Sequence, residues 1–263
     1  MDLLQALILG IVQGLTEFLP ISSSGHLEIG KVLLGVELKE NLAFSIAVHG
    51  ATVLSTLVIF RKDIATILKG IFRFQWNWET RFGLLILLSM VPVAVVGLFF
   101  EDAVEELFSC NLLLVGSMLL VTALLLMLSM VVKHRNEKPI GFLDALIIGI
   151  AQAVAVLPGL SRSGATIATG LMLGKSREEV ARFSFLMVII PILGANMLSM
   201  LKGGFSSDSG TGVSAIVVGF IAAFIVGCLA CQWMITLVKK GKLIWFSIYC
   251  LAIGSVAILW AIF

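Results

Sequence analysis

Six long apolar runs constrain the fold of this chain more than any other feature of its sequence. Each run is long enough to cross about 30 Å of hydrocarbon as a helix, at about 1.5 Å per residue. Only 13% of the 263 residues are charged and 59% are apolar, whereas a soluble domain usually carries about 25% charged residues. Lipid must therefore be the solvent for much of the surface, and we predict an all-α polytopic membrane protein. The predicted spans are 42–60, 81–100, 112–132, 183–201, 213–238 and 243–263.

Two shorter apolar stretches, 3–19 and 140–157, are built differently. Each runs into a proline and then into a small cluster of serines and glycines. A helix that breaks at membrane depth must have its freed backbone groups satisfied by protein or by a wet cavity. We therefore predict two re-entrant helix–loop–helix hairpins, 3–38 and 140–175, each entering and leaving on one side of the membrane.

The distribution of Lys and Arg residues predicts the orientation. If the spans alternate, starting outside at residue 42, the inner loops hold 14 of the 18 Lys and Arg residues, the outer loops hold three, and Arg162 lies in the second hairpin. Such an excess of positive charge marks the cytoplasmic side. This arrangement predicts that both termini and the acidic loop 101–106 lie outside.

The two predicted hairpins resemble each other. Residues 6–13 (ALILGIVQ) and 145–152 (ALIIGIAQ) are identical at six of eight positions, at an offset of 139. At the same offset, the tetrapeptide at 22–25 (SSSG) aligns with the one at 161–164 (SRSG). The sequence therefore predicts an internal repeat.

Each half of this repeat, 1–139 and 140–263, holds one hairpin and three predicted spans. Because three is odd, the second half would lie upside down relative to the first, which is the inverted-topology repeat of many transporters. One hairpin would enter from outside and the other from inside, so that their polar tips could meet near the middle of the membrane. A site at this meeting point would combine groups from both halves.

Polar side chains that could carry chemistry gather in these two hairpins. Ionisable residues within a membrane are costly and are functional candidates by default. Arg162, flanked by hydroxyls and glycine N–H groups, suits a phosphate group, and His26 near Ser23 suits nucleophile activation or proton transfer. Gln13 and Glu17 lie four residues apart on one helix face and offer oxygen ligands to a divalent cation. The predicted phosphate-binding residues are Ser22, Ser24, Gly25, Ser161, Arg162, Ser163 and Gly164.

Each of these residues also has a structural interpretation. Glu17 could cap a broken helix or pair with Arg162. The role of Ser22–Ser24 could be limited to satisfying backbone groups in the hairpin. His49, in the first span, is more often a packed, hydrogen-bonded histidine than a catalyst. All of these residues together are much harder to explain by chance than any single one of them.

Two motifs resemble the signatures of undecaprenyl-diphosphate phosphatases, the bacitracin-resistance family. They read QGLTEFLPISSSGH at 13–26 and PGLSRSGAT at 158–166. The resemblance covers the full length and the order of the motifs. It implies that Glu17, Ser23, His26 and Arg162 are the main active-site residues, with Ser22 and Gln13 in support. The family has Glu or Gln at the position of Gln13, and here Gln removes one negative charge from the expected metal site.

The resemblance also implies the reaction and its setting. The expected substrate is a C55 polyprenyl diphosphate lipid, hydrolysed to undecaprenyl phosphate and inorganic phosphate for peptidoglycan synthesis. The expected cofactor is a divalent cation, Mg²⁺ or Ca²⁺, held by Glu17 and Gln13. The protein is expected in the bacterial cytoplasmic (inner) membrane, with its active site facing the periplasmic side. Ser23 is the candidate nucleophile with His26 as its base or as the acid for the leaving group, while a phosphohistidine at His26 and direct attack by water both stay open.

A transporter or flippase of polyprenyl phosphate is the main alternative, because alternating access also uses inverted repeats and polar tips near the middle of the membrane. A channel is less consistent with tips that carry both an acid and an arginine. Membrane lipid is the expected surrounding partner, and no nucleic acid is expected. A homodimer is allowed, because small residues on the spans could pack helices within one chain or between two chains.

Overall fold

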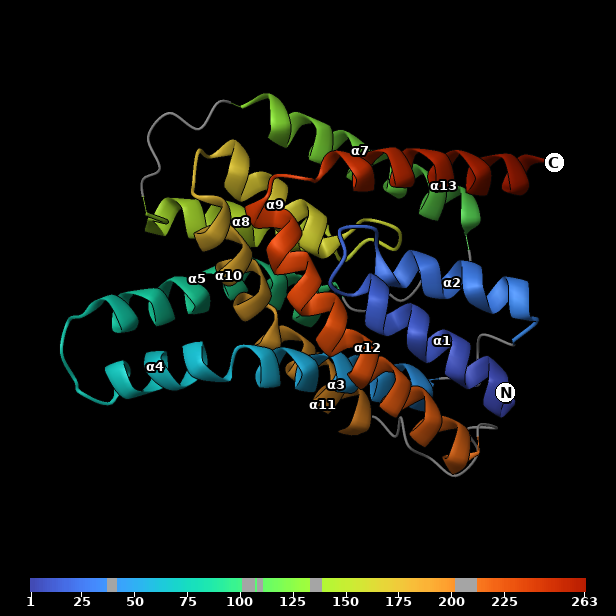
Figure 1. The fold of residues 1–263 in the computed structure, drawn as a ribbon, viewed down its shortest axis with the longest axis horizontal. Coiled ribbons are helices and arrows are strands. Elements are labelled where there is room, and N and C mark those ends of the chain that lie inside the picture. Colours follow the sequence, from blue (N-terminus) through green and yellow to red (C-terminus); the bar gives the residue numbers. More distant parts are fainter. Residues whose placement is uncertain (37–41, 101–106, 108–110, 133–138, 202–211) are drawn as a thin grey trace.

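The computed structural model describes the whole chain except residues 37–41, 101–106, 108–110, 133–138 and 202–211 (Figure 1). The predicted acidic outer loop therefore lies outside the described residues. Within the described part of the chain the regular secondary structure is helical throughout, without strands. This confirms the predicted all-α class.

The helices vary in length from about three turns to more than seven. They are α1 (Leu3–Thr16), α2 (Ser23–Leu34), α3 (Leu42–Ile59), α4 (Arg61–Ile71), α5 (Trp78–Phe99), α7 (Leu112–Val131), α8 (Phe142–Val154), α9 (Arg162–Met172), α10 (Arg177–Met187), α11 (Ile189–Leu201), α12 (Val213–Lys239) and α13 (Ile244–Ile262).

Five segments of the described chain are long and apolar enough to cross a membrane, namely α5, α7, α10 with α11, α12 and α13. A sixth is reached if α3 and α4, which meet at a bend of 73°, are counted as one span. All six predicted spans fall on these segments, so the chain is a multi-pass membrane protein. The fourth begins at Arg177 rather than at residue 183, because Ser176 caps the helix by accepting a hydrogen bond from the N–H of Glu179.

The two predicted hairpins are broken helix pairs, α1 with α2 and α8 with α9. Each second helix begins at a serine cap. The Ser22 hydroxyl accepts a hydrogen bond from the N–H of Gly25, and the Ser161 hydroxyl accepts one from the N–H of Gly164. The aligned tetrapeptides therefore produce the same local structure, a capped helix start, at both breaks.

Close helix packing positions these broken pairs. Helix α1 packs along α12, α8 packs along α5, and α7 packs along α13. A Cβ atom on Gly10 would overlap the backbone of Gly219 in α12, and one on Gly149 would overlap the backbone of Ser89 in α5. Figure 1 shows that the two chain termini lie at the same end of the molecule, while the connection between α4 and α5 lies at the opposite end.

Candidate active site

The break after α1 holds a carboxylate with several hydrogen-bond donors. Glu17 follows the last turn of α1 and is only 8% exposed. Its Oε2 atom accepts hydrogen bonds from Gln13 Nε2 at 2.9 Å and from Ser23 Oγ at 2.6 Å. A buried carboxylate needs such donors because burial removes its hydration. The predicted helix face therefore brings Gln13 and Glu17 together, and the break adds Ser23.

The second broken pair supplies the opposite charge. Arg162 is the first residue of α9, and its guanidinium forms an ion pair with Glu17 Oε1. The pair joins residues 145 positions apart, one from each break. This contact brings together the acid and the arginine that the sequence singles out for a site, and it also fits the structural interpretation in which Glu17 pairs with Arg162.

The two breaks also contact each other directly. Ser163 Oγ donates a hydrogen bond to the carbonyl of Leu19 at 3.2 Å, and the N–H of Gly159 donates a long one, 3.5 Å, to Ser24 Oγ. The N–H of Ser161 donates to Thr122 Oγ1 in α7 at 3.0 Å. Each break therefore helps to satisfy the backbone of the other, as helix ends in lipid require.

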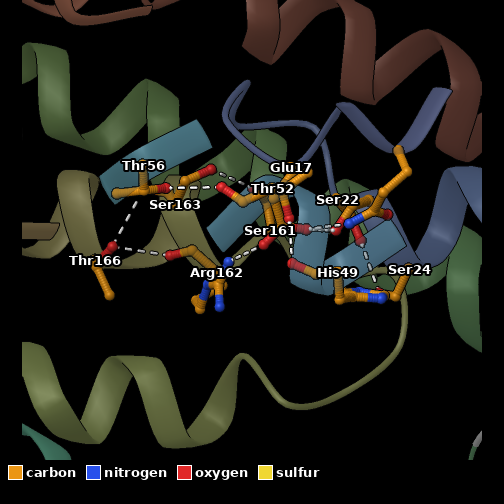
Figure 2. A network of polar contacts seen from close by, with 12 residues as sticks. Glu17, Ser22, Ser24, His49, Thr52, Thr56, Ser161, Arg162, Ser163 and Thr166 are labelled. Atoms are coloured by element: carbon orange, nitrogen blue, oxygen red, sulfur yellow. Dashed lines mark hydrogen bonds and ion pairs between the residues drawn. The ribbon is translucent and has the colours of Figure 1, made fainter. Parts of the chain in front are cut away.

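A cavity of about 220 Å³ lies between the two breaks and also reaches α3, α5 and α11. Its polar lining includes Glu17, Ser22, Ser23, Ser24, Ser161, Arg162, Ser163, His49 and Gln152. Figure 2 shows polar groups of both breaks and of α3 near Glu17 and Arg162, among them Ser22, Ser161, Ser163 and His49. Most of the predicted phosphate-binding residues therefore face one shared cavity.

His26 does not line this cavity. Its Nδ1 atom lies 2.8 Å from the carbonyl oxygen of Ser22, and its Nε2 atom lies 2.8 Å from the hydroxyl of Tyr249 in α13. A carbonyl can only accept, so Nδ1 carries the proton and Nε2 of the neutral ring accepts from Tyr249. The ring also stacks on Tyr249, with centroids 5.6 Å apart. The structure thus brings Glu17, Ser23 and Arg162 together but places His26 in a separate contact.

His49 lines the cavity, although its sequence context favours a packed histidine. Its Nδ1 atom donates to the carbonyl of Ser45 at 2.8 Å, which holds the ring in one orientation on α3. Since a carbonyl can only accept, Nδ1 carries a proton in this contact, and Nε2 is the ring nitrogen left for a second partner. The sequence offers one signal for this role, a histidine in an otherwise apolar span, and that signal alone does not separate a cavity residue from a packed one.

The part of the chain that the structure describes contains no group of three or more His, Cys, Asp or Glu side chains suited to a metal. The expected cation site at Glu17 and Gln13 therefore has a single carboxylate. Gln13 Oε1 is buried and has no hydrogen-bond partner among the described residues. An acceptor with no donor fits a cation ligand, because hard cations bind carboxylate and amide oxygens.

Comparisons with known proteins agree with the motifs. The family model described as "Bacitracin resistance protein BacA" matches residues 6–256. The chain is 58% identical over 262 residues to an undecaprenyl-diphosphatase of Bacteroides fragilis, covering 98% of each chain. It is 56% identical to one of Parabacteroides distasonis, covering 98% of each chain. It is 44% identical to one of Carboxydothermus hydrogenoformans, covering 97% of this chain and 95% of that protein.

Proposed function

Because the chain belongs to the BacA bacitracin-resistance family, we propose that it hydrolyses undecaprenyl diphosphate to undecaprenyl phosphate and inorganic phosphate. This reaction recycles the lipid carrier for cell-wall synthesis and confers resistance to bacitracin. The observation that carries the proposal is the contact of Glu17 with both Ser23 and Arg162 inside a membrane cavity. A carboxylate, a hydroxyl and a guanidinium in one cavity are the groups that phosphoryl transfer uses.

Arg162 and the start of α9 are suited to the reacting phosphate. The first turn of a helix presents unpaired N–H groups and a partial positive charge, which favour anions. The Arg162 guanidinium adds a full positive charge, and the hydroxyls of Ser161 and Ser163 add donors beside it. These groups would neutralise the charge on the phosphoryl oxygens in the transition state.

Ser23 is the proposed nucleophile, and Glu17 is the base nearest to it. As Ser23 Oγ forms a bond to the terminal phosphorus, the bond from that phosphorus to the bridging oxygen breaks and undecaprenyl phosphate leaves. The Ser23 proton passes to Glu17 Oε2, which already accepts its hydrogen bond. Water then hydrolyses the phosphoserine and releases inorganic phosphate. Arg162 would move its charge from Glu17 to the incoming phosphate. Oε2 of Glu17 could then accept this proton, while Oε1, the atom that Arg162 leaves, would be available to a cation.

We also propose the inverted repeat and the re-entrant hairpins as the architecture of the site. The packing supports this arrangement, because α1 of the first half lies on α12 of the second, while α8 of the second half lies on α5 of the first. Gly10 and Gly149, which are aligned at the offset of 139, are both close-contact residues, one in each of these two helix pairs. The site then faces the periplasmic side of the bacterial inner membrane, with both termini outside.

A divalent cation, Mg²⁺ or Ca²⁺, is the proposed cofactor, with Glu17 and the Oε1 atom of Gln13 as its protein ligands. When bound, it would supply positive charge that neutralises the phosphate oxygens. The chain's own residues hold the substrate and move the proton.

The test is phosphate release from undecaprenyl diphosphate by the purified protein in detergent, with and without a chelator. We expect release by the natural chain and a loss of at least about a hundred-fold in kcat/KM for Arg162→Ala, since removal of one group that stabilises transition-state charge costs about that much. A flippase without hydrolytic activity would release no phosphate. Full turnover by a folded Arg162→Ala protein would contradict the assignment.

A further inference from the structure

One buried side chain in the cavity wall has no partner. Gln152, in the last turn of α8, is 1% exposed. Neither its Oε1 nor its Nε2 atom has a hydrogen-bond partner within the described residues. A buried amide with no partner is unfavourable and calls for an explanation. Gln152 lines the same cavity as Glu17 and Arg162, so the missing partner can come from a molecule in that cavity.

The aligned residue in the first half shows why Gln152 is unpaired. Gln13 corresponds to Gln152 at the offset of 139, and its amide donates to Glu17 one helical turn later. The residue one turn after Gln152 is Val156, whose side chain cannot accept a hydrogen bond. The two halves therefore use the same amide differently. The first amide holds the acid in place, and the second has no partner within its own helix.

The cavity that Gln152 lines has apolar as well as polar walls. Its apolar lining includes Val93 of α5, Ala155 and Val156 of the second break, and Pro191 and Ala195 of α11. The charged groups, Glu17 and Arg162, come from the two breaks. A diphosphate whose terminal phosphorus lies against Ser23 must place its second phosphate elsewhere in the cavity, toward the lipid chain. The buried amide of Gln152 has no partner among the described residues and can donate an N–H to that second phosphate, while Arg162 and Ser23 are engaged at the terminal one.

We propose that the Gln152 amide N–H binds the lipid-proximal phosphate of the polyprenyl diphosphate, the phosphate that stays on the lipid after hydrolysis. The inference rests on the proposed function. The rotatable side chain of Gln152 can turn its amide into the cavity by a change of torsion angle. Because the contact involves the retained phosphate, the product undecaprenyl phosphate keeps it and inorganic phosphate does not.

The test compares Gln152→Met, which keeps the size of the side chain and removes the amide, with Gln232→Met on the exposed face of α12 as the matched control. For Gln152→Met we expect the KM for undecaprenyl diphosphate and the inhibition constant of undecaprenyl phosphate to rise about ten-fold or more, as for a lost hydrogen bond to a charged group. The inhibition constant of inorganic phosphate should change less than about two-fold, since this ligand makes no contact with Gln152. The melting temperature of the empty protein should stay the same or rise, because an unpaired buried amide has been removed.

Unchanged binding of undecaprenyl phosphate by Gln152→Met would overturn the inference. So would an equal loss for both phosphate ligands together with a lower melting temperature, since that result indicates a structural role. If Gln152→Met does not fold, Gln152→Glu is the second variant. It keeps the shape and adds a charge that should repel the lipid phosphate, so unweakened binding of undecaprenyl phosphate by this variant would likewise overturn the inference.

If the natural chain released no phosphate, the proposed reaction would fail. The inference could still be tested by binding. Added undecaprenyl phosphate should raise the melting temperature of the natural protein more than that of Gln152→Met, and this measurement requires no turnover.

Discussion

Glu17 connects three parts of the chain through its two oxygen atoms. Gln13 reaches it from one turn earlier, Ser23 from beyond the break, and Arg162 from the second broken pair. A carboxylate in apolar surroundings is stable only with such partners, and removal of one partner leaves an uncompensated charge. Only Arg162 is positively charged among these partners, so a phosphate that attracts Arg162 removes the one opposite charge from Glu17.

Two adjacent serines allow the role of Ser23 to be tested. Ser23 donates to Glu17, whereas Ser24 contacts Ser22 and the N–H of Gly159. We expect Ser23→Ala to lower kcat by at least about a thousand-fold with little change in KM, because a lost nucleophile removes the covalent step. Ser24→Ala should lower kcat/KM by only about ten-fold. Phosphate release measures both, and similar modest losses for the two variants would argue against Ser23 as the nucleophile.

Which histidine faces the cavity could not be predicted from the sequence. The motifs predict that Glu17, Ser23, His26 and Arg162 lie in one site. The structure places Ser23 and Arg162 in contact with Glu17, but His26 contacts Tyr249 instead. The direction of the His26 ring depends on Tyr249, which lies 223 residues further along the chain. Gln152 has no local signal either, because its unpaired state follows from the packing of α8 against distant helices. Side-chain direction at these positions is a property of tertiary contacts.

At the level of helices, glycines determine how closely the broken pairs approach the long spans. Gly10 and Gly14 of α1 face the backbone of α12, and Gly149 of α8 faces the backbone of α5. Lipid exerts no hydrophobic force between helices, so close van der Waals contact at small residues is a main source of helix association. This packing holds the two breaks in place, and so it positions Glu17 relative to Arg162.

Alanine substitutions test this packing. In Gly10→Ala and Gly149→Ala the new methyl group would overlap backbone atoms of the facing helix, so each should lower stability by about 1–3 kcal/mol. Gly97→Ala is the matched control, because a Cβ atom at Gly97 in α5 meets no described atom within 4 Å. It should be neutral or slightly stabilising, since alanine favours helix. Thermal unfolding in detergent measures all three, and equal stability of Gly149→Ala and Gly97→Ala would contradict the packing argument.

The helices themselves are largely predictable from the sequence, because span length and apolar composition respond to the thickness of the membrane. The prolines and serine clusters predict both helix breaks. Helix α4, in contrast, falls in a segment that the sequence assigns to a basic inner loop, because it contains Arg61, Lys62 and Lys69. Its apolar side chains alternate with these charges at helical spacing, so that it continues α3 as a bent, amphipathic helix instead of a loop.

At the scale of the whole molecule, charged residues tie several helices together. Arg182 pairs with Asp63 at 2.5 Å, and its guanidinium lies 5.0 Å from the centre of the Trp78 ring. Lys239 pairs with Glu178 at 2.8 Å. These residues belong to α4, α5, α10 and α12 and lie in or beside the segments that the sequence assigns to the inner side. The Lys and Arg residues of these segments favour a cytoplasmic location for them, in agreement with the proposed orientation.

The proposed orientation can be measured with introduced cysteines. Phe74 is 90% exposed in the connection between α4 and α5, at the end opposite the termini, and Val213 is 78% exposed at the start of α12. In a variant without the native cysteines, Val213→Cys should react with a membrane-impermeant thiol reagent in intact cells. Phe74→Cys should react only after the cells are opened, because the proposed orientation places this end and the positive residues near it in the cytoplasm. The reverse pattern would place the termini inside, and reaction of both cysteines in intact cells would contradict a single orientation.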